Sequence, residues 1–272
     1  MRCASIAAWA LVLLVGATHP PLSSAQQAPR PFEPEIGQPG KDVVWVPTPP
    51  ALVEKMLDLA QVSSADFVMD LGSGDGRNVI AAAKRGARAL GVEFNPDMVG
   101  LSERLAREAG VADRAQFVKG DMFTADISKA TVMALFLLPS NMLQLRSKFF
   151  ALAPGSRIVS NTFRIEGWTA DKSETVGGDC TAWCEAILWI VPAKVEGRWR
   201  TATGDLALKQ DFQMVSGTMT LGGQATEVKG KLNGRQITLS DGTREYTGVA
   251  TDGDIELSTT GASAPLRFTR SQ

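Results

Sequence analysis

Histidine is nearly absent from this sequence of 272 residues: it occurs once, as His19, near the N-terminus. Tyrosine also occurs once, as Tyr246. An excess of either charge is missing as well, because 28 basic and 29 acidic residues leave a formal net charge of −1. No basic stripe runs along the chain. Since phosphate binding requires clustered Lys and Arg, we expect no nucleic-acid partner.

The first 25 residues have the pattern of a signal peptide. Arg2 supplies a positive start, an apolar run follows from Ala4 to Ala17, and small residues at 23–25 allow cleavage before Gln26. The run is shorter than the ~20 apolar residues of a membrane span, and an uncleaved N-terminal anchor is the alternative. Either way the flanking charge directs the folded part out of the cytoplasm. We predict an exported protein, periplasmic or secreted, whose mature form does not span the membrane.

Cleavage of this segment removes His19, and the mature chain then has no imidazole. A Ser-His-Asp triad, a Cys-His pair and a histidine metal site are therefore excluded, and we expect no metal. Of the three cysteines, Cys180 and Cys184 remain. In an oxidising compartment such a pair predicts a disulfide, which requires a turn between the two residues.

The rest of the chain divides by composition into three parts. Residues 26–42 are rich in proline and poor in apolar residues, which predicts an extended, mobile leader. Residues 43–195 alternate expected strands and helices, so they predict a doubly wound, mostly parallel sheet. In residues 196–272, short alternating runs separated by Asn-Gly and Asp-Gly turns predict a small antiparallel barrel or sandwich. The strands expected in 43–195 are 66–71, 88–93, 115–118, 131–138, 157–163 and 185–191, and the main helices are 78–85, 96–110 and 141–152.

The most informative motif is a glycine-rich turn that follows an apolar strand. Gly72, Gly74 and Gly76 alternate with Ser73 and Asp75, and a helical pattern begins directly afterwards. Glycine allows a sharp turn and a close approach to a ligand. The spacing G-x-G-x-G differs from the dinucleotide fingerprint G-x-G-x-x-G, which counts against a dinucleotide oxidoreductase. The carboxylates of Asp70 and Asp75 would repel a pyrophosphate and favour a cationic ligand such as S-adenosylmethionine.

The motif Asp70-Leu-Gly-Ser-Gly-Asp-Gly76 resembles the first motif of class I S-adenosylmethionine-dependent methyltransferases. The resemblance implies that Asp70 and Gly72, Ser73, Gly74 and Gly76 bind the cofactor. It also implies that Glu93, at the end of the next strand, binds the ribose hydroxyls. By the same resemblance Asp121 accepts from the adenine amino group, Met122 packs on the ring, and the last strand of the sheet is antiparallel.

A second resemblance concerns the segment before the first helix. Val46-Pro47-Thr48-Pro49 followed by DLGSGDGR is similar to a group of bacterial proteins and to mitochondrial lysine methyltransferases that modify an ATP synthase subunit. This likeness extends from about Val43 to Val195 and implies that Thr48 lies over the cofactor. From its sequence context alone, Thr48 is also a plausible helix cap, with Pro49 as the first helical residue.

The sequence favours an enzyme that transfers a methyl group from S-adenosylmethionine to an unknown acceptor, for which a protein lysine amine is the candidate. Ser140 and Asn141, near the end of the fourth strand, are candidates for orienting the acceptor, with capping of the next helix as the competing role. The alternative function is an exported, non-catalytic protein that binds S-adenosylmethionine or a nucleoside. Neither the acceptor nor the oligomeric state follows from the sequence.

Overall fold

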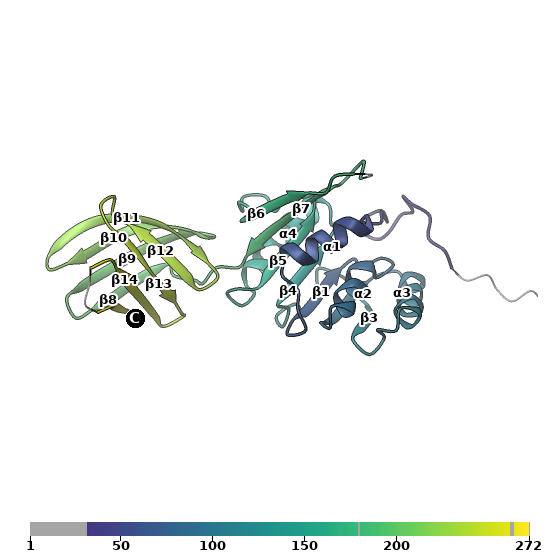
Figure 1. Ribbon diagram of the computed structural model, residues 1–272, viewed down its shortest axis with the longest axis horizontal. Helices are drawn as coiled ribbons and strands as arrows, with labels where there is room; N and C mark the ends of the chain where they lie inside the picture. The colour runs from purple at the N-terminus through teal and green to yellow at the C-terminus, as the bar shows by residue number, and fades with distance from the viewer. Residues whose placement is uncertain (1–31, 179, 262–263, 272) are drawn as a thin grey trace, which may run out of the picture. The chain divides into compact units, whose positions relative to one another are not determined.

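The computed structural model describes residues 32–178, 180–261 and 264–271, which form an α/β region followed along the chain by a β barrel (Figure 1). The predicted signal peptide and its cleavage site lie outside the described residues. None of the helices in these ranges combines the length and the apolar character that a bilayer crossing demands.

The α/β region is built on one seven-stranded sheet with the order β3-β2-β1-β4-β5-β7-β6. The pairs β1–β2, β2–β3, β1–β4 and β4–β5 are parallel, whereas β7 runs antiparallel to both β5 and β6. The mostly parallel sheet and the antiparallel last strand confirm the predicted architecture. The strands are β1 (Phe67–Leu71), β2 (Arg88–Glu93), β3 (Ala115–Lys119), β4 (Val132–Leu135), β5 (Arg157–Asn161), β6 (Lys172–Thr175) and β7 (Glu185–Ile190).

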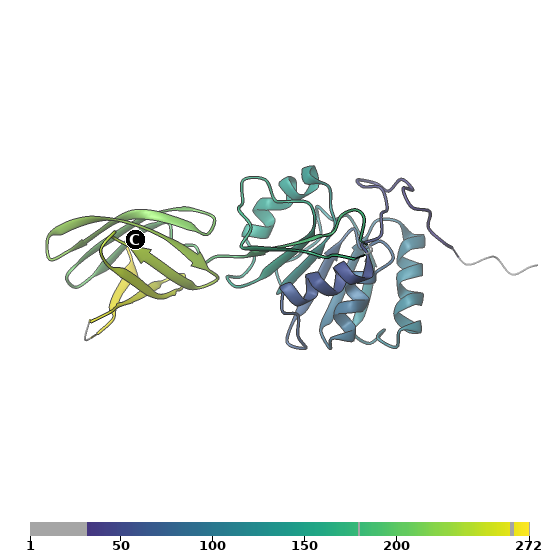
Figure 2. The same cartoon turned by 45° about the horizontal axis from the view of Figure 1, so that its top comes forward.

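Helices cover both faces of this sheet (Figure 2). Side chains of α1 (Pro50–Leu59), α2 (Arg77–Lys84) and α3 (Pro96–Glu108) pack on one face, and those of α4 (Pro139–Phe150) pack on the other. The strands supply both cores because successive side chains point to opposite faces. In β1, for example, Val68 belongs to the first core and Met69 to the second.

Three strands differ from the sequence-based expectation by two residues or more, and one of them is β5, which ends at Asn161 and not at residue 163. The fourth strand ends at Leu135 rather than near residue 138, because Pro139 already occupies the first turn of α4. Strand β6 was not predicted, since its sequence Lys-Ser-Glu-Thr is polar and mostly exposed. Such residues suit an edge strand, which buries little apolar surface and therefore leaves no hydrophobic pattern.

The C-terminal region is a closed eight-stranded barrel, which decides between the barrel and the sandwich expected from the sequence. Alternate residues of each strand point inward, and Trp199 and Phe268 are fully buried among them. Closure leaves no free sheet edge. The strands are β8 (Gly197–Thr201), β9 (Gly204–Asp211), β10 (Met214–Leu221), β11 (Gln224–Asn233), β12 (Gln236–Ser240), β13 (Glu245–Ala250), β14 (Asp254–Thr259) and β15 (Leu266–Arg270).

The predicted disulfide between Cys180 and Cys184 is present, with the two Cα atoms 5.9 Å apart. It closes a short turn immediately before β7, and the backbone N–H of Val176 donates to the carbonyl oxygen of Cys184 across this turn. The bridge therefore stabilises the local entry into β7 rather than joining distant parts of the chain.

Replacing both cysteines by serine is expected to lower the free energy of unfolding by at most ~2 kcal/mol, because so short a loop loses little entropy on closure. Denaturant unfolding of the oxidised protein, the reduced protein and the Cys180→Ser/Cys184→Ser variant measures this. Reductant should not change the free energy of unfolding of the variant. Collapse of the whole fold on reduction would contradict the local role assigned to the bridge.

Candidate functional site

The glycine-rich turn lies at the carboxyl end of β1 and leads into α2. Gly72, Gly74 and Gly76 all have positive φ angles of 68°, 56° and 78°, a conformation that side chains other than glycine rarely adopt. The backbone N–H groups of Gly72 and Ser73 both donate to the carbonyl oxygen of Val92 at the end of β2. The turn is thus anchored to the neighbouring strand, and the N-terminus of α2 faces the cleft beyond the sheet edge.

This cleft has a volume of about 840 Å³, including the part open to solvent. It is lined on one side by the ends of β1 and β2 and on the other by residues 38–48. A concave cleft lined by apolar side chains and a few polar groups is typical of small-molecule sites. It is also the place where open α/β sheets bind ligands, beyond the carboxyl ends of their strands.

Residues 38–48 form a strap across the cleft. The prediction that 26–42 is a mobile leader is therefore wrong for its last part, which belongs to this strap. Pro39 and Val44 form a β-bridge, and the N–H of Trp45 donates to the carbonyl oxygen of Gln38. Gly74 is close to the Trp45 indole, since a Cβ on this glycine would lie 2.8 Å from Nε1. Proline content alone did not reveal these contacts. The first two lie within the strap, and the third joins it to the glycine turn, which is distant in the sequence.

Asp70 is the most buried carboxyl group in the cleft, with 3% of its surface exposed. Burial raises its pKa well above the usual range; the amide of Asn78 opposes this by donating to Oδ2 at 3.1 Å, and the charges of Glu93 and Asp75 raise the pKa further. A buried carboxylate of this kind gains most from a cationic ligand group, because such a group replaces the hydration that the carboxylate has lost.

Asp75 does not act in the way the sequence argument assumed. Its carboxylate is paired with the guanidinium of Arg77, which also donates to the carbonyl oxygen of Thr48 at 2.6 Å. The negative charge of Asp75 is therefore largely compensated inside the protein. Arg77 occupies the position where a dinucleotide fingerprint would need its third glycine, and here it fastens the strap to the turn.

Glu93 and Asp121 lie at the ends of β2 and β3, as their spacing predicted. Glu93 accepts from the backbone N–H groups of Gly74 (3.0 Å) and Asn95 (2.9 Å). Asp121 accepts from the N–H of Phe123 and pairs with Lys41 of the strap at 3.1 Å. The Phe123 N–H and the Lys41 ammonium together hold the pKa of Asp121 below its usual value.

Met122 lines the cleft beside the glycine turn, and Thr48 lines it from the strap. Thr48 is buried, and its hydroxyl accepts from the amide Nδ2 of Asn161 at 3.3 Å. It does not cap α1, whose N-cap is Pro49 and which has no capping side chain. Of its two open roles, the structure therefore supports the position over the cleft.

Ser140 and Asn141 lie in the first turn of α4, and neither caps it, because the N-cap residue is Leu138. Asn141 is buried and donates to the carbonyl oxygen of Asp42 in the strap at 3.4 Å. Ser140 is exposed. Neither side chain is among those that line the cleft, and their role in orienting an acceptor stays a prediction.

Sequence reasoning missed four residues of this region: Lys41, Asn78, Phe136 and Asn161. Asn78 could have been noticed, because it stands in the first turn of the helix that follows the glycines. The other three carry no spacing signal. Lys41 and Phe136 reach the cleft only through the strap and the end of β4, and Asn161 contacts Thr48 from the end of β5. The side-chain oxygens of Asn78 and Asn161 are buried and have no hydrogen-bond partner among the residues that the structure describes.

The unpaired groups around the turn fit S-adenosylmethionine. The hydroxyl of Ser73 is buried without a partner and lines the cleft at the N-terminus of α2, where a carboxylate is favoured. Asp70 and the free oxygen of Asn78 suit an ammonium group. Glu93 would hold the ribose hydroxyls, and Met122 would pack on the adenine. Asp121 pairs with Lys41 and is not among the cleft-lining residues, so its contact with the adenine stays a prediction. The donors and acceptors thus match the charges of this ligand.

The fold and the cleft define a class I S-adenosylmethionine-dependent methyltransferase. A sequence model described as the ANTKMT methyltransferase domain matches residues 70–172. A protein-lysine N-methyltransferase of Saccharolobus islandicus is 45% identical over 129 residues, which cover 46% of this chain and 80% of that protein. The chain belongs to the same family of methyltransferases as this archaeal relative.

Two further comparisons agree on the class. A lysine N-methyltransferase of an ATP synthase subunit, from Rattus norvegicus, is 36% identical over 140 residues, 51% of this chain, and the chain spans only 64% of that protein. The crystal structure of an RNA methyltransferase from Salinibacter ruber with bound S-adenosyl-L-homocysteine is 44% identical. It has a TM-score of 0.52 and covers 55% of this chain and 96% of its own. All three relatives are named as methyltransferases, but they differ in the named acceptor.

Proposed function

We propose that this protein transfers a methyl group from S-adenosylmethionine to the side-chain amine of a lysine in another exported protein. The observation that carries the proposal is the set of cofactor-compatible groups around the glycine turn, in a chain 45% identical to a protein-lysine N-methyltransferase. A near-zero net charge supports a protein acceptor over RNA, because RNA binding relies on clustered basic residues.

The protein's own residues act by binding and orientation. Asp70 and Glu93 would hold the charged and ribose parts of the cofactor, and the strap would exclude water from above. Thr48 and Asn161 lie beside the cleft at the ends of the strap and of β5, where their oxygens can accept from the N–H groups of an amine. Fixing two reactants in line supplies a large part of the rate of such a transfer.

The cofactor supplies a methyl carbon on a sulfonium, which is already an activated leaving group. The lysine ammonium must lose its extra proton to solvent water before its nitrogen can react. Its nitrogen lone pair then forms the new bond to the methyl carbon as the carbon–sulfur bond breaks and that electron pair goes to sulfur. The product amine releases one further proton to water.

Export is part of the proposal. It is supported by the signal-peptide pattern of residues 1–25 and by the Cys180–Cys184 disulfide, since such bridges persist in oxidising compartments. Cell fractionation tests it directly. Recovery of the mature chain from the cytoplasm alone would contradict export and leave the assignment as a methyltransferase untouched.

The function is tested by incubating the protein with methyl-labelled S-adenosylmethionine and a cell-envelope extract, alongside the Asp70→Ala variant. We expect label in material that protease degrades and ribonuclease does not, recovered as methyllysine after hydrolysis. The variant should transfer little label.

The other outcomes are distinct. Label that ribonuclease removes would show that the acceptor is RNA and not lysine. Cofactor binding by calorimetry without any labelled product would favour the alternative of a non-catalytic binding protein. Absence of cofactor binding would overturn both.

A further inference from the structure

Three aromatic side chains gather at the carboxyl edge of the sheet, beyond the cofactor cleft. Phe136 follows the last residue of β4, Phe163 follows the end of β5, and Trp183 precedes the start of β7. Strand pairing brings these positions together, because Leu135 is opposite Ser160 and Asn161 is opposite Ala186. The cluster is thus a product of the sheet register and not of sequence spacing.

Phe136 is the central member and connects the cluster to the cleft. It lines the cleft, stacks on Phe163 with 5.9 Å between ring centroids, and meets Trp183 at 6.0 Å with the rings tilted by 59°. Trp183 is 43% exposed although it is a large aromatic residue. An exposed indole joined to a ligand cleft is more typical of a binding surface than of a core.

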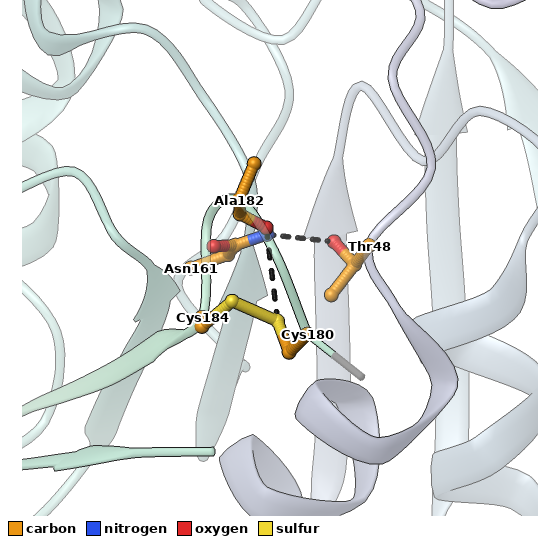
Figure 3. The surroundings of a disulfide bond; sticks show 5 residues. All are labelled: Thr48, Asn161, Cys180, Ala182 and Cys184. Atoms are coloured by element: carbon orange, nitrogen blue, oxygen red, sulfur yellow. Dashed lines mark hydrogen bonds between the residues drawn. A yellow bond between two sulfur atoms is a disulfide. The ribbon is translucent and has the colours of Figure 1, made fainter. Parts of the chain in front are cut away.

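The disulfide holds Trp183 in this place. The indole-bearing residue lies between Cys180 and Cys184 and has a positive φ of 54°, which is unusual for a bulky side chain. Figure 3 shows that the bridged turn lies next to the Thr48–Asn161 hydrogen bond. The 3.7 Å approach of the Cys180 sulfur to the Ala182 carbonyl oxygen is a contact only, because a bridged sulfur carries no proton.

The polar groups beside the aromatic cluster are a hydrogen-bond acceptor, the side chain of Asn161, and one compensated ion pair. The side-chain oxygen of Asn161 is fully buried and has no partner within the protein. The nearby charges of Arg164 and Glu185 compensate each other in an ion pair of 2.7 Å. A ligand group with N–H donors and a positive charge would therefore meet oxygen atoms and aromatic faces, and the charge of Arg164 is compensated by Glu185.

We propose that Phe136, Phe163 and Trp183 form the aromatic wall of the acceptor site, that this wall selects an aliphatic ammonium such as the lysyl side chain, and that the Cys180–Cys184 bridge holds Trp183 in the wall. Aromatic faces attract a cation and also cover the apolar methylene chain that carries it. The proposal rests on the proposed function for the identity of the acceptor, but it is tested by binding alone.

The test uses the full chain saturated with S-adenosyl-L-homocysteine and two small probes. N-acetyl-lysine methylamide carries the ammonium, and N-acetyl-norleucine methylamide has the same chain without it. Ligand-observed NMR gives both dissociation constants. We expect the lysine probe to bind several-fold more tightly than the norleucine probe. Trp183→Leu should lower the affinity for the lysine probe about three- to thirtyfold, the range of a cation–π contact. Trp183→Phe should keep most of this affinity.

Two controls separate the wall from general damage. The affinity for S-adenosyl-L-homocysteine, measured by calorimetry, should stay within twofold for every Trp183 variant, which also shows that each variant is folded. Val118→Ala truncates an exposed side chain on β3, the edge strand remote from β7, and should leave the affinity for the lysine probe unchanged. The Cys180→Ser/Cys184→Ser variant should bind the lysine probe more weakly than the wild type and more tightly than Trp183→Leu.

The results that overturn the proposal are specific. Equal affinity for the two probes, no binding of the lysine probe, or no effect of Trp183→Leu would each exclude the aromatic wall. An unchanged affinity in the double serine variant would exclude the role of the bridge. If S-adenosyl-L-homocysteine itself does not bind, the proposed function fails, and this outcome is distinct from failure of the wall alone.

Discussion

Asp70→Asn is expected to weaken the binding of S-adenosylmethionine by about ten- to a hundredfold, the usual cost of losing a hydrogen bond to a charged group. At the same time, it should make the ligand-free protein more stable at neutral pH. Both effects have one cause. The buried carboxylate has lost its hydration and has no cationic partner in the ligand-free protein, and asparagine has nearly the same shape without the charge.

The pH dependence follows from the direction of the pKa shift. The folded protein holds a proton on Asp70 to a higher pH than the unfolded chain does, because the folded pKa is raised. The stability that Asp70 contributes is therefore complete below its unfolded pKa, and it is lost as the pH rises through the folded pKa. Cofactor binding has the opposite dependence, since the ionised carboxylate binds the cation, and affinity should rise over the same window.

Thermal unfolding and calorimetry over a pH series measure both effects. Asp126→Asn is the matched control, because Asp126 is exposed and the backbone N–H of Ser128 lowers its pKa. That variant should bind the cofactor normally and should not gain stability at neutral pH. Undiminished cofactor affinity in Asp70→Asn, or lower stability than the wild type across the whole series, would show that Asp70 does not have the assigned role.

Gly76→Ala should destabilise the fold by about 2–5 kcal/mol, combining ~1–2 kcal/mol for a left-handed backbone with a side chain and ~1–3 kcal/mol for overpacking. Gly76 has a φ of 78°, and a Cβ there would lie 2.6 Å from the Phe117 ring and 3.0 Å from the Cβ of Ser102. The ring cannot move freely, because Phe117 is buried in the core under α2 and α3.

The same substitution at Gly100 is the control, and we expect the opposite sign. Gly100 lies in an exposed position within α3, where an added Cβ meets nothing within 4 Å. Alanine there should stabilise the protein by ~1 kcal/mol, because glycine is a poor helix former. Denaturant unfolding of both variants gives the comparison. Equal effects of the two substitutions would contradict the close contact at Gly76.

Much of the α/β region could be predicted because its signals are local. The strand at 88–93 was predicted with its observed ends, and Asn95 caps α3 with its side chain, accepting from the N–H of Asp97. The errors occurred where a segment is defined by distant partners. Residues 38–42 have no apolar pattern, yet they cover the cleft, and β6 is recognisable only because β7 pairs with it.

The candidate site divides in the same way. The positions of Asp70, the glycines and Glu93 at strand ends could be predicted from the chain, because they follow from the alternation of strands and helices. Their roles in binding the cofactor came from the family resemblance and stay predictions. The compensation of Asp75 by Arg77 was not visible, since it depends on the conformation of both side chains.

The sequence by itself was thus sufficient to predict the class of fold, the cofactor, the disulfide and the division into an α/β and a β-rich part. Each of these depends on motifs whose residues are close together in the sequence. The aromatic cluster that we propose as the acceptor site was decided by tertiary structure. Phe136, Phe163 and Trp183 are far apart in the sequence, and only the register of β4, β5 and β7 places them at one edge. No spacing rule encodes such a cluster, because connections of different lengths can give the same strand pairing.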